Sequence, residues 1–125
     1  MDHSPGFLKI VEDAKAHVRE ISIEDTKRRM ERGARVIDVR EDREWEAGHV
    51  RGAEHLGKGV IERDIENVVP DKNADVILYC GGGFRSALAT ESLQKMGYRN
   101  VLSMAGGWRG WLAENGPVEM ADDGN

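Results

Sequence analysis

Three short runs of apolar and β-branched residues constrain the fold of this chain more than any other feature. The runs are RVIDV at 35–39, VILYC at 76–80 and NVLSM at 100–104. Such short runs are typical of strands that are buried on both faces, and segments with helical patterning separate them. Because strands alternate with helices, we expect an α/β domain with a parallel sheet and helices on both of its faces.

The helical segments are indicated by capping residues and by apolar spacing. Ser4-Pro5 is a typical helix start, and apolar residues then recur at steps of four and three, namely Phe7, Val11, Ala14, Val18 and Ile21. Further helices are predicted from a capping sequence at 22–25 to Gly33, at 61–69, at 85–96 and after 105. Residues 40–59 are charged and interrupted by glycine, which predicts a loop with little regular structure.

The same patterns divide the chain into parts. We expect an amino-terminal helical extension over 1–21, one domain over 22–116, and a flexible acidic tail over 117–125 that is frayed from Pro117 onward. The apolar stripe of the first helix is expected to pack on the domain.

Composition and charge exclude several classes of protein. The chain has 125 residues, of which 39% are hydrophobic and 33% charged, and this is typical of one soluble globular domain. The net charge of -5 argues against nucleic-acid binding, which depends on clustered Lys and Arg. No apolar run approaches the ~20 residues that span a bilayer, and the amino terminus lacks the pattern of a signal peptide. We therefore expect a cytoplasmic protein that binds neither membranes nor nucleic acid.

The segment YCGGGFRSALA at 79–89 contains the single cysteine of the chain, Cys80. One cysteine permits neither an internal disulfide nor a cysteine-based zinc site. Cys80 ends a predicted strand, and in parallel α/β sheets the functional loops follow the carboxyl ends of the strands. This placement suits either a buried structural cysteine or a reactive one.

Three features of the segment favour a reactive cysteine. A free thiol has a pKa of roughly 8.5, so it needs stabilisation to ionise at neutral pH. The helix that begins near Arg85 directs its positive dipole end at the loop, and Arg85 adds a full positive charge. The glycines let consecutive backbone N–H groups converge on the sulfur or on a bound anion. The segment therefore predicts a cup lined by N–H donors, with Cys80 at its base.

The spacing between Cys80 and Arg85 distinguishes two chemistries. Thiol phosphatases need the spacing C-x5-R, because a tetrahedral phosphate fills a wide loop. Here the spacing is C-x4-R, which is one residue shorter. The tighter loop favours a single sulfur atom carried on Cys80 over a phosphoryl group, so we predict sulfur transfer. A P-loop is excluded because the pattern GxxxxGK[ST] is absent.

Four segments of the chain resemble the rhodanese family of sulfurtransferases in its single-domain form. They are VIDVRE at 36–41, EWEAGHVRGAEHL at 44–56, CGGGFRS at 80–86 and AGGWRGW at 105–111. Their order and spacing follow the family over about residues 22–115. The resemblance implies a three-layer α/β domain with a central, parallel, five-stranded sheet, and an active loop that runs from Cys80 to Arg85.

The resemblance also implies a two-step reaction without a metal or an organic cofactor. The Cys80 thiolate would take the outer sulfur of thiosulfate, or of a related donor, as a persulfide. It would pass that sulfur to cyanide or to a thiol such as glutathione or thioredoxin. The loop residues that would bind the substrate anion and hold the negative charge of the persulfide are Gly81, Gly82, Gly83, Phe84, Arg85 and Ser86.

Residues outside the loop are expected to have supporting or structural roles. The resemblance suggests that Asp38 and Arg40 form a partly buried polar network that braces the loop. His49 is interpreted as structural rather than as a general base, because a stabilised thiolate needs no base. Trp108 and Trp111, at helical spacing, are expected in the core or the pocket wall rather than stacked on substrate.

Alternatives from other functional classes stay open at this point. A persulfide carrier, which receives sulfur from one protein and delivers it to another with weak thiosulfate turnover, also suits a loop with few side chains. A regulatory module without catalysis is disfavoured because Cys80 is retained. An arsenate or phosphate enzyme is disfavoured by the length of the loop.

Overall fold

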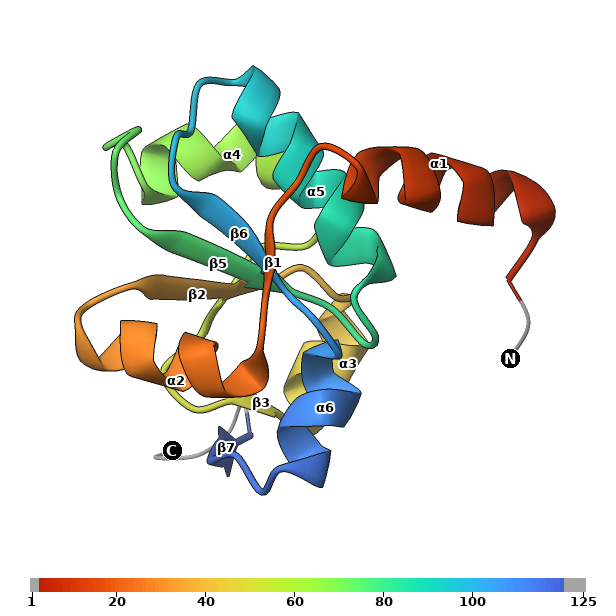
Figure 1. Ribbon diagram of the computed structural model, residues 1–125. Helices are drawn as coiled ribbons and strands as arrows, with labels where there is room; N and C mark the ends of the chain where they lie inside the picture. Colours follow the sequence, from red (N-terminus) through yellow and green to blue (C-terminus); the bar gives the residue numbers. More distant parts are fainter. Residues whose placement is uncertain (1–2, 121–125) are drawn as a thin grey trace.

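The computed structural model describes residues 3–120 (Figure 1). The helices are α1 (Pro5–Lys15), α2 (Ile23–Glu31), α3 (Asp42–Ala47), α4 (Ile61–Val68), α5 (Phe84–Lys95) and α6 (Gly107–Ala113). The strands are β1 (Glu20–Ile21), β2 (Arg35–Asp38), β3 (His49–Val50), β4 (Glu54–His55), β5 (Val76–Tyr79), β6 (Val101–Met104) and β7 (Val118–Glu119). Within this part of the chain, every helix is too short or too polar to cross a membrane.

A five-stranded sheet with the order β1-β6-β5-β2-β4 forms the centre of the domain. Its middle consists of the predicted strands, since β5 pairs in parallel with β2 on one side and with β6 on the other. The outer pairs, β1 with β6 and β2 with β4, are parallel as well. The α/β class and the parallel five-stranded sheet are therefore confirmed.

Helices cover both faces of this sheet (Figure 1). Successive residues of a strand point to opposite faces. Thus Leu78 belongs to a core cluster with Ile65 of α4 and Leu93 of α5. Its neighbour Ile77 belongs to the cluster on the other face, with Ile23 of α2 and Trp111 of α6. The three-layer arrangement that the sequence predicted is present.

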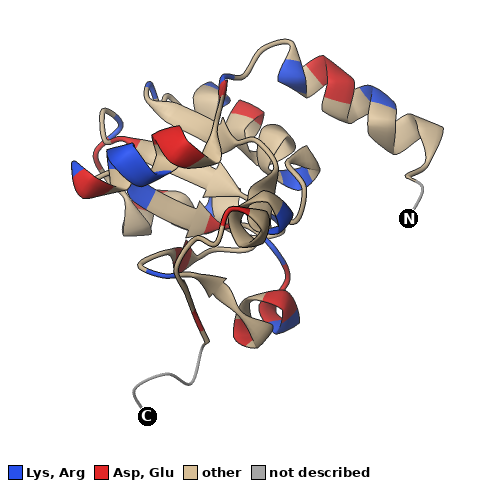
Figure 2. Ribbon diagram, turned by 60° about the horizontal axis from the view of Figure 1, so that its bottom comes forward, with Lys and Arg blue, Asp and Glu red and all other residues tan. Residues whose placement is uncertain are grey.

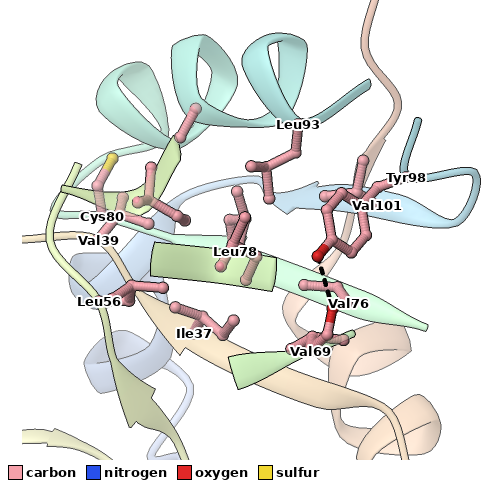
Figure 3. Close-up of a cluster of buried hydrophobic side chains, with 13 residues drawn as sticks. Ile37, Val39, Leu56, Val69, Val76, Leu78, Cys80, Leu93, Tyr98 and Val101 are labelled. Atoms are coloured by element: carbon pink, nitrogen blue, oxygen red, sulfur yellow. Dashed lines mark hydrogen bonds between the residues drawn. The ribbon is translucent and has the colours of Figure 1, made fainter. Parts of the chain in front are cut away.

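The cluster beneath α4 and α5 extends as far as Cys80 (Figure 3). In Figure 3, Cys80 lies at one end of the buried side chains, beyond Val39 and Leu78. The other end is closed by Tyr98, whose hydroxyl donates a hydrogen bond to the carbonyl oxygen of Val69. The cysteine is thus attached to the rigid centre of the domain rather than to a flexible surface loop.

The prediction that residues 40–59 lack regular structure is wrong. This segment contains α3, β3 and β4. The first turn of α3 is capped reciprocally, because Glu41 and Glu44 each accept a hydrogen bond from the other residue's backbone N–H. β4 exists because it pairs with the edge of β2, with His55 opposite Asp38. Strands of two residues carry no periodic pattern, and a pairing between distant segments is invisible in the local sequence.

The prediction of one helix up to Ile21 is wrong at its carboxyl end. Helix α1 ends at Lys15, and Glu20–Ile21 form the edge strand β1. Ile21 is buried because it completes a parallel pairing with Met104 rather than a helical stripe. The packing of α1 on the domain is as expected: Val11 and Ala14 are buried, and the helix contacts α5.

The expectation of a frayed tail from Pro117 is also corrected. Val118–Glu119 pair antiparallel with β3, and the indole N–H of Trp111 donates to the carbonyl oxygen of Pro117 at 2.8 Å. These contacts fix the chain next to α6. The rest of the predicted tail, residues 121–125, lies outside the described residues.

Charged residues are distributed over the described surface rather than gathered by sign. Figure 2 shows Lys and Arg interspersed with Asp and Glu along the outer helices. On α2, for example, Arg28 and Arg29 pair with carboxylates of the same helix.

Candidate active site

The candidate site is the turn between β5 and α5, which begins at Cys80. Gly83 adopts a left-handed backbone with φ of 101°, which glycine reaches without strain, and this places it at the start of α5. The N–H of Gly83 lies 3.1 Å from Sγ of Cys80, and the N–H of Ser86 lies 3.4 Å from it. Both groups donate to the sulfur from the amino-terminal end of α5, where the helix dipole favours negative charge.

The far side of the cradle is fixed by a chain of hydroxyl groups. Oγ of Ser86 lies 3.6 Å from the Cys80 sulfur and 2.8 Å from Oγ of Ser103 on β6. Ser86 and Ser103 are both fully buried. The carbonyl of Ser86 also accepts a hydrogen bond from Thr90. Buried hydroxyls with several partners hold one geometry, so Ser86 is a positioned group of the site.

The amino-terminal end of α6 closes over the same turn. The N–H of Trp108 donates to the carbonyl oxygen of Cys80 at 2.7 Å, and that of Arg109 donates to Gly81 at 3.1 Å. A side chain at Gly107 would overlap the Cys80 carbonyl oxygen, so this approach requires glycine. The segment AGGWRGW is therefore part of the site through its backbone.

A cavity of about 560 Å³ opens above the cysteine. The residues that line it are His3, Phe7, Cys80, Gly82, Phe84, Arg85 and Arg109. The structure thus brings Cys80 and three of the predicted loop residues, Gly82, Phe84 and Arg85, to one cavity, while the N–H groups of Gly83 and Ser86 donate to the sulfur. His3, Phe7 and Arg109 were not predicted to belong to it.

Arg85 lines the cavity, but its guanidinium is bound by a residue of α3. Its Nη1 and Nη2 lie 2.9 and 3.2 Å from the two carboxylate oxygens of Glu44. This bidentate pair holds the pKa of Glu44 well below its usual range, at about 2. Arg85 therefore ties the active turn to α3, a role that was not predicted from the sequence.

The ion pair between Glu44 and Arg85 predicts that the stability of the folded protein depends on pH. A carboxylate whose pKa is depressed on folding stabilises the native state above its unfolded pKa, and that contribution is lost as the pH falls. We expect wild type to exceed Glu44→Gln in free energy of unfolding at neutral pH. The difference should shrink between about pH 5 and pH 2. Urea unfolding across this range measures it. Glu46→Gln, which changes an exposed glutamate of the same helix, is the matched control; a pH-independent difference would contradict the pairing.

Arg109 provides a second cation at the cavity. Its guanidinium lies against the active turn, because side-chain carbons placed on Gly81 and Gly82 would come within 3.8 and 3.4 Å of its Nη2. Arg109 is exposed, and no carboxylate within residues 3–120 pairs with it. Among the described residues, Arg109 is thus a positive charge at the active turn that is not bound by a carboxylate. The sequence shows an arginine inside AGGWRGW, but the position of this arginine beside the active turn follows only from the contact between α6 and the turn.

Asp38 and Arg40 lie in a fully buried network directly beneath the turn. Nε and Nη2 of Arg40 bind the Asp38 carboxylate, the closer contact being 2.8 Å. The same carboxylate accepts the hydroxyl of Tyr79 at 2.7 Å, and that hydroxyl accepts the N–H of Val50. Burial, together with the charge of Asp38, raises the pKa of Tyr79 far above its usual value. Since Tyr79 precedes Cys80, the network anchors the strand that carries the cysteine.

His49 and the tryptophans have structural contacts. The His49 ring stacks on Trp45 with centroids 3.4 Å apart, and its Nδ1 lies 3.0 Å from the Trp45 carbonyl oxygen. Trp111 is 2% exposed within the core, and Trp108 packs beneath the guanidinium of Arg40. None of the three lines the cavity above Cys80. These contacts agree with the structural interpretation of each side chain.

The site thus consists of a cysteine at the end of a parallel strand, with its sulfur held in a cradle of N–H groups. The profile of the family described as "Rhodanese-like domain" matches residues 22–114. The chain therefore belongs to the rhodanese-like domain family.

Curated relatives include sulfurtransferases and a sulfur carrier. The thiosulfate sulfurtransferase GlpE of Haemophilus influenzae (strain PittEE) is 30% identical over 103 residues, which cover 82% of this chain and 96% of that protein. The putative sulfur carrier protein YrkF of Bacillus subtilis is 29% identical over 99 residues, covering 78% of this chain. The chain spans only 52% of the length of YrkF.

Solved structures of this fold match over nearly the whole chain. The polysulfide-sulfur transferase homodimer of Wolinella succinogenes has a TM-score of 0.78 at 26% identity, covering 96% of this chain and 91% of that one. A Rhodopseudomonas palustris protein of unknown function, described as a possible tyrosine phosphatase, has a TM-score of 0.84 at 25% identity, covering 95% and 98%.

Proposed function

We propose that the chain is a rhodanese-type sulfurtransferase that moves sulfane sulfur from thiosulfate, or a related donor, through a persulfide on Cys80. The observation that carries the proposal is the cradle at the cysteine, in which the N–H groups of Gly83 and Ser86 both donate to Sγ. Similarity to proteins named thiosulfate sulfurtransferase supports the choice of donor.

The first step transfers one sulfur atom. The Cys80 thiolate attacks the outer sulfur of thiosulfate, a new S–S bond forms, and the S–S bond of thiosulfate breaks. Sulfite leaves with the electron pair, so the products are Cys80–S–S⁻ and SO₃²⁻. The terminal sulfur of the persulfide carries the negative charge and would lie above the turn, where the helix dipole and the loop N–H groups stabilise it.

The second step regenerates the Cys80 thiolate. Cyanide attacks the outer sulfur of the persulfide, the S–S bond breaks, and thiocyanate leaves while Cys80 recovers its electron pair as thiolate. A thiol acceptor follows the same course, with its own proton released. Glutathione or thioredoxin as acceptor, and a cytoplasmic location, stay predictions of the sequence.

Arg109 is proposed to bind the oxygens of the donor, because the guanidinium of Arg85 is already held by Glu44. We expect Arg109→Ala to raise KM for thiosulfate roughly tenfold or more, because the donor loses one charge-assisted hydrogen bond. Arg109→Lys should recover part of the loss, since it keeps the charge without the planar fork.

The matched control for Arg109 is Arg63→Ala, because Arg63 is an exposed arginine that pairs with Asp64 on α4. Steady-state thiocyanate formation over a range of thiosulfate concentrations gives KM for each variant. Equal KM values for Arg109→Ala and wild type would remove Arg109 from the donor site.

The function is tested by mixing the purified chain with thiosulfate and cyanide and measuring thiocyanate. Catalytic turnover supports a sulfurtransferase. A single sulfur per chain without turnover would instead indicate a carrier, as the likeness to YrkF suggests. Hydrolysis of p-nitrophenyl phosphate without sulfur transfer would favour the phosphatase alternative and contradict the proposal.

A further inference from the structure

Helix α1 lies outside the residues that match the family, yet it forms one wall of the cavity above Cys80. It runs beside α5 in Figure 1. Ser4 caps its first turn, and the buried Val11 and Ala14 anchor it to the domain. The helix is therefore a fixed part of the site, and its side chains can determine what the cavity admits.

The wall is aromatic, and it is built by Phe7 of α1 and by His3, which lies just before the helix. The rings of His3 and Phe84 have centroids 4.8 Å apart, those of His3 and Phe7 5.2 Å, and those of Phe7 and Phe84 6.3 Å. Phe84 is the first residue of α5 and belongs to the active turn. The cluster thus connects α1 directly to the loop of Cys80.

The cavity combines this wall with a cation. Arg109 lies against Gly81 and Gly82 and is free of carboxylate partners within residues 3–120. A cavity of about 560 Å³ is far larger than a small inorganic ion requires. Its size and its aromatic lining, together with the arginines Arg85 and Arg109, are typical of a site for an organic anion.

We propose that α1 makes this an organic-donor site, which accepts anions of the type R–SO₂–S⁻ with an apolar or aromatic group R. The group R packs against His3, Phe7 and Phe84, and the sulfonyl oxygens face Arg109. This inference rests on the sulfurtransferase function proposed above. The Cys80 thiolate attacks the terminal sulfur, the S–S bond to the sulfonyl group breaks, and the sulfinate R–SO₂⁻ leaves with the electron pair.

Two thiosulfonates that differ only in R provide the kinetic test. Benzenethiosulfonate and methanethiosulfonate are compared by kcat/KM in the cyanide assay, and the aryl-to-methyl ratio is measured for each variant. Differences in leaving-group reactivity cancel when the ratios of two variants are compared. We expect Phe7→Ala to lower the ratio roughly tenfold, the effect of losing the main apolar contact of the ring. Leu8→Ala removes an exposed apolar side chain from the same helix and should preserve the ratio.

Binding of an unreactive analogue tests the wall without turnover. Benzenesulfonate should bind wild type more tightly than methanesulfonate by calorimetry, and Phe7→Ala should remove most of that preference. His3→Ala, a change at an exposed position, should weaken it in the same direction and covers the case in which Phe7→Ala does not fold.

The outcomes separate the two claims. Suppose that the protein turns over thiosulfate but that neither Phe7→Ala nor His3→Ala lowers its preference for the aryl donor. This result would overturn the organic-donor site, while the proposed sulfurtransferase function would still hold. If no donor is turned over, the proposed function fails. In that case, benzenesulfonate binding that is weakened by Phe7→Ala would still support the aromatic wall as a binding surface. No binding of benzenesulfonate, or binding that Phe7→Ala leaves unchanged, would overturn it.

Discussion

Cys80→Ser is expected to abolish thiocyanate formation from thiosulfate and cyanide, with a fall of roughly a thousandfold or more in kcat. Serine keeps the size and the hydrogen-bonding capacity of the side chain, but its hydroxyl does not ionise at neutral pH and cannot form a persulfide. The N–H groups of Gly83 and Ser86 would then donate to a neutral oxygen. The measurement is the steady-state rate in the cyanide assay at saturating thiosulfate.

The control for this prediction is the stability of the variant. Cys80 is 1% exposed and ends one core cluster, so a thermal unfolding curve must show that Cys80→Ser is folded at the assay temperature. A folded serine variant that retains the wild-type rate would show that sulfur transfer does not proceed through Cys80.

Asp38→Ala is expected to cause the largest loss of stability, about 3–5 kcal/mol in free energy of unfolding. The change leaves the guanidinium of Arg40, which is 3% exposed, without its counter-charge, and it also removes the acceptor of the Tyr79 hydroxyl. Both groups would stay buried, and an unpaired buried charge is far more unfavourable than an exposed one. The midpoint of urea unfolding measures the effect.

Asp13→Ala is the matched control for the buried aspartate. Asp13 pairs with Lys9 on the exposed face of α1, where both side chains are more than half exposed. Removing such a pair changes the free energy of unfolding by about 0.5 kcal/mol or less. Similar effects of the two substitutions would contradict the structural role assigned to Asp38.

The centre of the sheet and the active turn could be predicted because their signals are local. The strands β2, β5 and β6 are continuous apolar runs, and the turn at Cys80 has a distinctive order of cysteine, glycines and arginine. The edge strands were missed for a physical reason. β1 and β4 are two residues long and owe their existence to pairing with strands far away in the sequence.

The site residues that sequence reasoning missed are those that only the fold brings together. Glu44 pairs with Arg85 across 41 positions of the chain. Arg109 reaches the turn because Gly107 permits close contact between α6 and the Cys80 carbonyl. Phe7 lies in a helix whose apolar stripe predicted packing but not a partner, and His3 lies just before that helix, so their place beside Phe84 had no signal in the sequence.

The persulfide on Cys80 is the central claim, and the mass of the intact protein tests it most directly. Protein treated with thiosulfate alone, freed of small molecules and measured without reductant, is predicted to gain the mass of one sulfur atom. Cyanide should remove the added mass and yield one equivalent of thiocyanate, and Cys80→Ser should gain nothing. Turnover of thiosulfate by the wild type without any added sulfur on Cys80 would contradict the account.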